Sequence, residues 1–349
     1  MESLGFVNLT PFAAQPLLLS DERGADVLTF VVRATYALQP LQVGAPLTVA
    51  EEQAPVCLAP EYTGKPESSS VRYDSDAVVA KLATDVVLIG QAHAPHARAT
   101  HADVSLAVGP VRSVVRVFGD RIWTKTLGRW SASAPEPFEA IPLVYERAFG
   151  GWDRSNPDVA KHEYEARNPV GVGFVSKKHG KVQEGTRLPN LEQPRDLIGS
   201  PNDRPAPAGF GFIGPHWQPR VALAGTYDDQ WKARRMPLLP EDFDRRFYNA
   251  AHPALTASGF LRGGEPVEIA NASPRGTLRF QLPQVRPLAT VRMKDGATHR
   301  VDMALDTVIV NTDEDKLFLV WRGSLPIHKR IHDVLWAKAQ PAGNGGVGR

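Results

Sequence analysis

The hydrophobic residues in the first third of the chain gather in short runs rich in β-branched and aromatic side chains, and turn-forming residues separate these runs. Such side chains suit a pleated, half-buried surface, so the pattern predicts strands over residues 26–36, 85–93, 104–108, 111–118 and 121–125. Residues 118–121 are predicted to close a hairpin between the last two strands. Short strands at close spacing are typical of an antiparallel sandwich or an open barrel.

The last quarter of the chain repeats this pattern. Strands are predicted over residues 276–282, 288–293, 299–303, 307–310 and 317–321, with a hairpin turn at Lys294-Asp295-Gly296. A short C-terminal helix is predicted over residues 328–338, and the Gly-rich residues 340–349 are predicted to form a disordered tail. The expected fold class is therefore mainly β.

The middle of the chain differs in composition. Residues 145–275 contain 14 Gly and 14 Pro, about a fifth of the segment against a usual ~12%. The segment is nevertheless rich in aromatic side chains, which a flexible linker lacks, so we expect ordered irregular chain packed on the sheets. One short helix is expected over residues 240–247, with Phe243 and Phe247 on one face. The expected regions are an N-terminal β region over 1–144, the irregular segment over 145–275, a C-terminal β region with its helix over 276–339, and the tail over 340–349.

Charge and run length exclude two classes of function. The chain has 40 basic and 38 acidic residues and a formal charge of +2, which is too balanced for a dedicated nucleic-acid binder. Its apolar runs are far shorter than the ~20 residues that cross a bilayer, and Glu2 stands where a secretory signal carries positive charge. We therefore expect a cytoplasmic protein without a nucleic-acid or membrane partner. Cys57 is the only cysteine and is expected to be a small, partly buried side chain.

Three groups of side chains could carry chemistry. The spacing of His93, His96 and His101 could gather imidazoles around zinc, but no carboxylate or Cys completes the site. Acidic residues at 228–229 and 241–244 lie near aromatic residues, as in a sugar-cleaving pocket, yet helix capping explains them more simply. The glycine clusters at 171–173 and 209–211 lack the ending of a phosphate-binding loop. We expect no catalytic residues, no metal and no cofactor.

The middle segment carries an ordered series of motifs. They are Tyr145-Glu146-Arg147-Ala148-Phe149-Gly150-Gly151, Arg167-Asn168-Pro169-Val170-Gly171-Val172-Gly173-Phe174, Leu188-Pro189-Asn190-Leu191-Glu192, Pro207-Ala208-Gly209-Phe210-Gly211, Gly225-Thr226-Tyr227-Asp228 with Trp231, and Leu239-Pro240-Glu241-Asp242-Phe243-Asp244. In order and spacing, the series resembles a bacterial family catalogued as a numbered domain of unknown function, whose members lie beside genes of the type VI secretion system. The resemblance covers residues 6–282 and departs at residues 249–254, where members often carry an Asp-Gln pair.

Members of this family look like adaptors or chaperones that load a toxic effector onto the secretion spike and its PAAR-type tip. The resemblance therefore implies a non-catalytic protein that binds a secreted effector through a PAAR-like or N-terminal targeting region. The spike protein is a further candidate partner. The motif residues expected to brace loops are Glu146, Arg147, Gly150, Gly151, Gly209, Gly211 and Asp228.

An adaptor needs aromatic and Arg anchors, because these side chains bury a large area and still form hydrogen bonds at their polar tips. Trp152, Trp217, Arg220 and Trp231 are the candidates for partner binding, although the same residues could equally form the core of the loops. Two other functions stay open. A hydrolase acting on a cell-envelope polymer would need an acidic pair that lines a cleft, and a structural subunit of the secretion machine would self-assemble.

Overall fold

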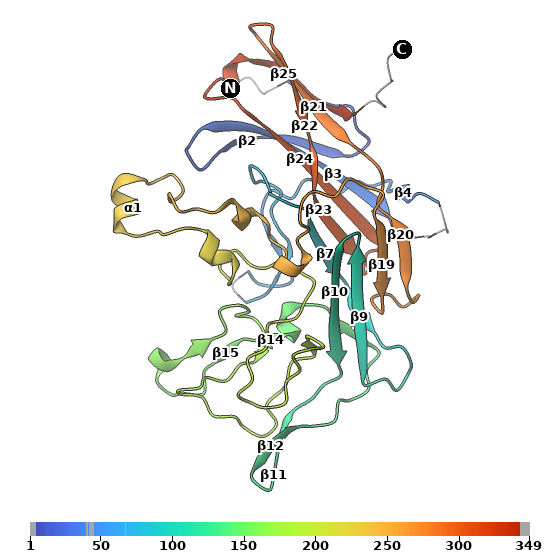
Figure 1. The fold of residues 1–349 in the computed structure, drawn as a ribbon, viewed down its shortest axis with the longest axis vertical. Coiled ribbons are helices and arrows are strands. Elements are labelled where there is room, and N and C mark those ends of the chain that lie inside the picture. Colours follow the sequence, from blue (N-terminus) through green and yellow to red (C-terminus); the bar gives the residue numbers. More distant parts are fainter. Residues whose placement is uncertain (1–4, 40, 42–44, 67, 343–349) are drawn as a thin grey trace.

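The computed structural model describes residues 5–39, 41, 45–66 and 68–342, and the fold is mainly β. Three sheets of six, five and four strands stack against one another without closing into a barrel, and an irregular lobe lies below them (Figure 1). Most strand pairs are antiparallel, as the short, closely spaced runs predict.

The sheets contain strands from distant parts of the chain. The six-stranded sheet contains, in order, β2 (Ala13–Ser20), β3 (Asp26–Ala37), β24 (Lys316–Pro326), β23 (Ala304–Asn311) and β7 (Asp85–Ile89), with β4 (Thr48–Val49) paired to β3. The five-stranded sheet contains β18 (Leu191–Glu192), β10 (Val111–Phe118), β9 (His101–Val108), β19 (Pro266–Ala270) and β20 (Leu278–Gln281). The four-stranded sheet contains β1 (Phe6–Asn8), β25 (Val334–Pro341), β21 (Pro287–Met293) and β22 (Thr298–Asp302).

Short elements complete the fold. The two-stranded pairs are β11 (Trp123–Thr126) with β12 (Arg129–Ala132), β13 (Ala140–Pro142) with β8 (Gln91–His93), β14 (Phe149–Gly150) with β17 (Val172–Gly173), β15 (Trp152–Asp153) with β16 (Glu163–Tyr164), and β5 (Glu61–Tyr62) with β6 (Val71–Tyr73). One α-helix, α1 (Asp229–Arg234), lies on an arm formed by residues 225–244. The 3-10 helices are Tyr145–Arg147, Val159–Lys161, Arg220–Leu223, Arg245–Tyr248, Pro253–Leu255 and Ile331–Asp333.

Strand β3 joins two hydrophobic cores. Its residues Leu28 and Phe30 pack in a core with Val291 of β21 and Ala337 of β25, under the four-stranded sheet. Farther along the strand, Val32, Ala34 and Tyr36 belong to the largest core, which also holds Val104, Leu106 and Val108 of β9. β24 pairs with β3 from Lys316↔Ala37 to Pro326↔Val27, so the two ends of the chain share one sheet.

The helix predicted over residues 328–338 is wrong. Residues Ile331–Asp333 form one 3-10 turn, and the chain then continues as β25, which pairs with β21 on one side and β1 on the other. Buried Val334, Ala337 and Ala339 face the neighbouring core, and the hydrogen bonds of both adjacent strands outweigh a local preference for helix. Within the expected tail, Gln340 and Pro341 end β25, whereas residues 343–349 lie outside the described residues.

The hairpin predicted at residues 118–121 is also wrong. Both edges of β10 are already paired, one with β9 and the other with β18, and β11 pairs with β12 instead. Arg121 turns inward, and its guanidinium pairs with buried Glu192. The predicted helix over residues 240–247 is a 3-10 turn at Arg245–Tyr248, but Phe243 and Phe247 do meet, with ring centroids 5.7 Å apart. In the described part of the chain, no helix is long and apolar enough to cross a membrane.

Candidate functional site

Four ion pairs lie in a buried layer between the six-stranded sheet and the irregular segments that cover it. We call these pairs the ionic layer. They are Arg33–Asp76 at 2.9 Å, Arg220–Asp74 at 2.9 Å, Lys81–Asp85 at 2.8 Å and Arg322–Asp306 at 2.8 Å. Every side chain in the layer is at most 7% exposed. Isolated charges are very costly to bury, so each charge in the layer has an opposite partner.

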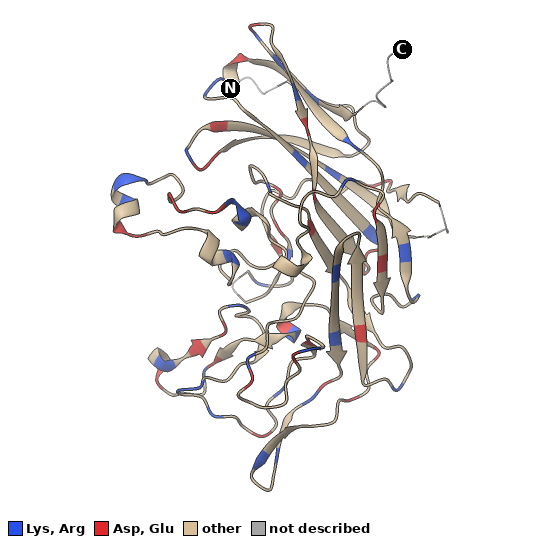
Figure 2. Ribbon diagram, viewed as in Figure 1, with Lys and Arg blue, Asp and Glu red and all other residues tan. Residues whose placement is uncertain are grey.

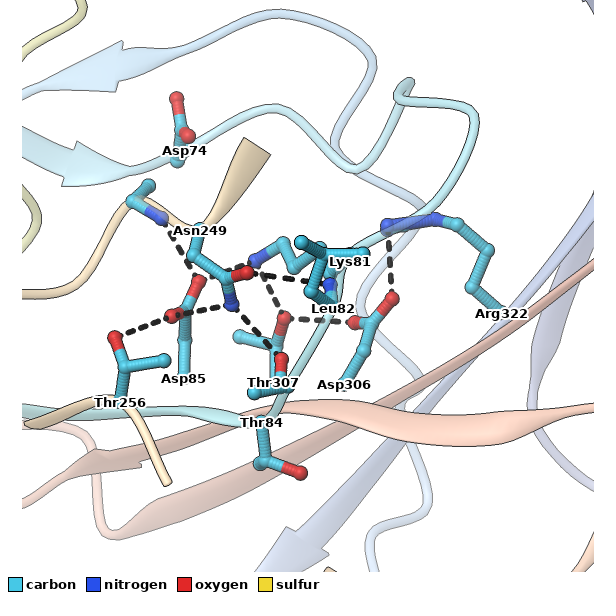
Figure 3. Close-up of polar contacts among 12 residues, drawn as sticks. Asp74, Lys81, Leu82, Thr84, Asp85, Asn249, Thr256, Asp306, Thr307 and Arg322 are labelled. Carbon is cyan, nitrogen blue, oxygen red and sulfur yellow. Dashed lines mark hydrogen bonds and ion pairs between the residues drawn. The ribbon is translucent and has the colours of Figure 1, made fainter. Parts of the chain in front are cut away.

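Two of these pairs are linked through a threonine (Figure 3). Lys81 Nζ donates to Asp85 Oδ2 and to Thr307 Oγ1, both at 2.8 Å, and Thr307 Oγ1 donates to Asp306 Oδ1 at 2.9 Å. Arg322 approaches the second oxygen of Asp306. Burial raises the pKa of Asp306, although the charges of Arg322 and Lys81 oppose this shift. The chain of contacts joins β23, β24 and β7 to the segment before β7.

Asp85 also holds a loop that comes from far along the sequence. Its carboxylate accepts from Asn249 Nδ2 at 3.0 Å, from the backbone N–H of Ala250 at 2.9 Å and from Thr256 Oγ1 at 3.2 Å. The side chain of Asn249 also accepts from the backbone N–H of Leu82. The segment 249–254 is therefore fastened to β7 through Asp85.

The first motif braces loops on both sides. Glu146 accepts from the backbone N–H of Ser70 and from Ser70 Oγ, each at 2.7 Å, and from Thr63 Oγ1 at 2.8 Å. Arg147 donates to Asn190 Oδ1 at 3.2 Å and lies 3.6 Å from Asp120 Oδ1. Glu146 and Arg147 thus hold separate neighbours, and among the ion pairs of the described residues none joins the two.

Gly150 and Gly151 lie where two segments cross. A side chain on Gly151, whose φ is +89°, would place its Cβ 2.2 Å from the carbonyl oxygen of Gly171. At Gly150 a Cβ would lie 2.2 Å from the carbonyl oxygen of Asn168. The buried Asn168 closes the crossing, because its Nδ2 donates to the carbonyls of Tyr145 at 2.8 Å and Phe149 at 3.0 Å. The crossing therefore fixes the start of β15.

Trp217 and Arg220 are buried in the loop core. Trp217 is 8% exposed and packs edge-on against Tyr145 with centroids 5.7 Å apart. Gly209 and Gly211 leave room for the ring of Tyr145. Arg220 pairs with Asp74 and also donates to the carbonyls of Ile213 and Phe247, both at 2.9 Å. Of the two roles that the sequence allowed, the structure gives these residues the core position.

Trp231 lies on the arm that projects beside the sheets, where both signs of charge are present (Figure 2). Asp228 caps α1 by accepting from the backbone N–H of Trp231 at 2.7 Å, and Trp231 Nε1 donates to the carbonyl of Leu238 at 2.8 Å. Asp228, Trp231, Glu241 and Asp242 do line one pocket of about 220 Å³. Donation from the backbone N–H and then the hydroxyl of Thr226 holds the pKa of Asp242 below its usual value, which suits a loop brace and not a general acid.

Trp152 is the partner-binding candidate that the structure leaves most exposed. It is 47% exposed and stacks on Tyr164, which is also 47% exposed, with centroids 4.5 Å apart and planes at 26°. The two residues face each other across the β15–β16 pair. The guanidinium of Arg154 lies 5.1 Å from the centroid of the Trp152 ring. We call Trp152, Tyr164 and Arg154 the aromatic ledge.

A basic turn lies beside the ledge. Asp153, the neighbour of Trp152, accepts from the backbone N–H groups of Ser155 at 2.9 Å and Ser176 at 2.8 Å. Burial raises the pKa of Asp153, but the hydrogen bonds from Ser155 and Ser176 outweigh it, so the pKa falls below the ordinary value. This anchor holds the turn that contains the exposed Lys177 and Lys178. The ledge therefore combines two stacked rings with nearby positive charge.

The structure does not bring the remaining candidates from the sequence, the three histidines and Cys57, together in one site. Within residues 5–342 as described, no group of three or more His, Cys, Asp or Glu side chains could hold a metal ion, so His93, His96 and His101 are not gathered into one site. Cys57 is buried, and burial raises the pKa of its thiol to about 12. Sequence reasoning did not select Tyr164 or Arg154. The only signal for them was their position in two short polar–aromatic segments on either side of a turn.

Comparison with family models matches residues 23–322 to a family described as an uncharacterized protein conserved in bacteria (DUF2169). The matched region contains the ionic layer, the glycine crossing and the aromatic ledge. Comparisons with curated proteins and with solved structures gave no match. Because the match spans most of its length, the chain belongs to the DUF2169 family of bacterial proteins.

Proposed function

We propose that this protein is a non-catalytic adaptor of a type VI secretion system that binds a secreted toxic effector and promotes its loading onto the spike and its PAAR-type tip. The observation that carries the proposal is the aromatic ledge, an exposed stacked pair of large rings. Tryptophan and tyrosine dominate binding energy at protein interfaces, because they bury a large area at a low cost in conformational entropy. The motif resemblance supplies the class of partner.

Neighbouring contacts hold the backbone of the ledge in place, which favours a role in binding. Trp152 directly follows the Gly150–Gly151 crossing. The next residue, Asp153, accepts from the backbone N–H of Ser176 and so fastens β15 to that turn. Stacking between Trp152 and Tyr164 restricts the rotation of both rings before any partner arrives. A pre-ordered surface loses less entropy on docking, so more of its contact energy is available as affinity.

The charge beside the rings favours one kind of partner surface. Arg154, Lys177 and Lys178 are exposed, whereas the carboxylate of Asp153 is turned inward to backbone N–H groups. Complementary charge at an interface speeds association and rejects partners of like charge. We therefore expect an effector segment with an apolar patch and nearby Asp or Glu residues. Covering that patch would stabilise the effector by mass action until it meets the spike.

The experiment is co-expression with a toxin that carries a PAAR-type region and is encoded beside this gene. The Trp152→Ala/Tyr164→Ala variant is expected to bind the toxin about 30-fold more weakly in a quantitative pull-down, which corresponds to a loss near ~2 kcal/mol, typical of interface anchors. Leu335→Ala is the control, because Leu335 is 55% exposed on β25, outside the ledge and outside every motif. Toxin solubility is measured in the same lysates.

Two further measurements decide the interpretation. Loss of binding counts only when the double variant melts at the temperature of the parent protein. Trp217→Ala, by contrast, is expected to destabilise the fold by about 3–5 kcal/mol, because it empties a buried site. If the toxin stays soluble and is secreted equally well without this protein, the adaptor proposal is wrong. Hydrolysis of purified cell-envelope polymer by the unmodified protein would contradict its non-catalytic part.

A further inference from the structure

A groove of about 560 Å³ opens where the three large sheets meet. Its lining comes from β22, β23, β24 and the segments that enter β19 and β21. This junction is far along the chain from the ledge and belongs to none of the motifs, which end near residue 244. Its volume is in the range that holds a drug-sized ligand or a short stretch of peptide.

The floor of the groove is apolar. Leu305 and Trp321 lie at depth, 3% and 2% exposed, whereas Phe260 at the side is 42% exposed. Val285, Pro287 and Met303 continue the same surface. A large aromatic ring that stays this exposed beside an apolar hollow marks a place where a second apolar group gains by leaving water.

Arginines surround the floor. The lining contains Arg262, Arg286 and Arg300 against one acid, Asp302, which is a formal excess of two positive charges. Asp302 pairs with Arg300 at 2.9 Å. Among the ion pairs of the described residues, none involves Arg262 or Arg286, and both side chains are exposed. Glu265, three residues along the chain, accepts from the backbone N–H of Arg262 at 2.7 Å.

The rim that carries Arg262 is held in place by its backbone. Gly263 and Gly264 follow with φ of +86° and +88°, and a Cβ on Gly263 would lie 2.5 Å from the carbonyl oxygen of Pro283. On the opposite side, the backbone carbonyl of Arg286 accepts from the N–H of Ala342 at 2.7 Å. Both arginines therefore project from fixed backbone, and only their side chains adjust.

We propose that this groove binds an extended segment of a partner protein that places an apolar side chain on the floor and Asp or Glu residues against Arg262 and Arg286. Guanidinium groups bind carboxylates through two parallel hydrogen bonds, so they select such acids more strongly than a diffuse positive surface does. The apolar floor disfavours a purely acidic polymer, because its charges would lose water without gaining a partner. The groove is a second site, and its occupant need not be the effector bound by the ledge.

Selection from a random 12-residue phage-displayed library on the purified full-length protein tests the proposal. Enriched peptides are expected to share an apolar residue flanked by Asp or Glu, and a synthetic copy is then titrated by fluorescence anisotropy. Arg262→Glu/Arg286→Glu is expected to weaken the peptide about 100-fold, because carboxylates then face carboxylates. Phe260→Ala should weaken it about 10-fold. Affinity should fall as salt rises.

Arg129→Glu/Arg195→Glu is the control, because it makes the same change of charge at two exposed arginines outside the groove. It should leave the affinity unchanged, and Trp152→Ala should do the same, which separates this proposal from the adaptor role. Enriched peptides without acids, or equal loss in both double variants, would overturn the proposal. Tighter peptide binding by a chain that stops at Ala342 would also overturn it, because the C-terminal residues would then be the occupant. Self-association that Arg262→Glu abolishes would do the same, because a second copy of this chain would then be the occupant.

Discussion

At the residue scale, Asp85 of the ionic layer holds two segments in place, the one before β7 and the one over residues 249–256. It pairs with Lys81 and accepts from Asn249, Ala250 and Thr256, all while its side chain is 0% exposed. Hydrophobic residues of similar volume often stabilise a core at least as well as a buried ion pair. We infer that the pairs persist because they fix the register of irregular segments, which apolar packing alone leaves open.

Asp85→Asn tests this inference for one residue. The change keeps the shape of the side chain but leaves the Lys81 ammonium buried beside a neutral group. The new NH2 group must also face hydrogen-bond donors, because both oxygens of Asp85 now accept. Removing one partner of a buried pair costs about 3–5 kcal/mol, so the midpoint of urea unfolding should fall sharply. Asp302→Asn breaks an exposed pair and should cost under about 1 kcal/mol. Equal effects of the two changes would contradict the role given to Asp85.

The lowered pKa of Asp153 predicts that the stability of the fold depends on pH. Its pKa in the fold lies below the ordinary value of 3.8, so the folded state binds a proton less readily than the unfolded state. Its contribution to stability is therefore present above pH 3.8 and is lost as the pH falls through the lowered value. Asp153→Asn should cost about 1–3 kcal/mol at neutral pH. The difference between parent and variant should shrink below pH 4, measured by urea unfolding at a series of pH values. A constant difference would contradict this assignment.

At the scale of elements, the crossing at Gly150 and Gly151 predicts that an added side chain would destabilise the fold by steric overlap. Two glycine-to-alanine variants separate this overlap from the strain of positive φ. Gly151 and Gly128 both have positive φ, +89° and +81°, but a Cβ meets the Gly171 carbonyl at the first and nothing within 4 Å at the second. Gly128→Ala should cost about 1 kcal/mol from backbone strain alone. Gly151→Ala should cost more, about 3 kcal/mol, because two backbones must also separate. Thermal unfolding measures both, and the Gly151 variant should also weaken toxin binding through the ledge.

The strands show which elements the sequence could predict. Runs such as those of β3 and β10 carry their own signal in β-branched and aromatic residues, and both were predicted close to their observed bounds. β25 was missed because its sequence, VLWAKAQP, has such residues only at Val334 and Trp336, and the segment becomes a strand by pairing with β1 and β21. The partner of β10 was missed for a similar reason. Two-residue β18 begins 70 residues beyond the end of the predicted hairpin and gains its place through Asn190 and Glu192.

The same limit applies to the candidate site. Sequence reasoning selected Trp152, Trp217, Arg220 and Trp231 by residue type, and only burial separates the exposed ring from the two core residues. The ionic layer could not be predicted, because Asp85 and Asn249 are 164 residues apart and neither lies in a recognisable pattern of charges. A residue type indicates what a side chain can do, whereas long-range pairing decides whether it faces a partner.

At the scale of the whole molecule, the strand order predicts that the chain unfolds as one unit. β24 and β23, from the last eighth of the described chain, lie between β3 and β7 in the middle of the six-stranded sheet. The sequence regions 1–144 and 276–339 are therefore two parts of the same sheets, and neither can bury the face of β3 alone. Most backbone hydrogen bonds of β3 on one side come from β24, and a buried strand edge without a partner is costly.

A fragment of residues 1–275 tests this expectation. It keeps every motif of the irregular segment but loses β20 to β25. β3 then loses its pairing with β24 and β7 loses its pairing with β23, and the core residues Val32, Ala34 and Val87 become exposed. We expect the fragment to give a collapsed, poorly dispersed NMR spectrum, and the whole chain to unfold in a single cooperative transition. Adding residues 276–349 as a separate chain should restore dispersion, because the missing strands pair with edges that are already present. A well-dispersed spectrum from the fragment alone would show that the motif-bearing segment and the N-terminal strands form an independent unit.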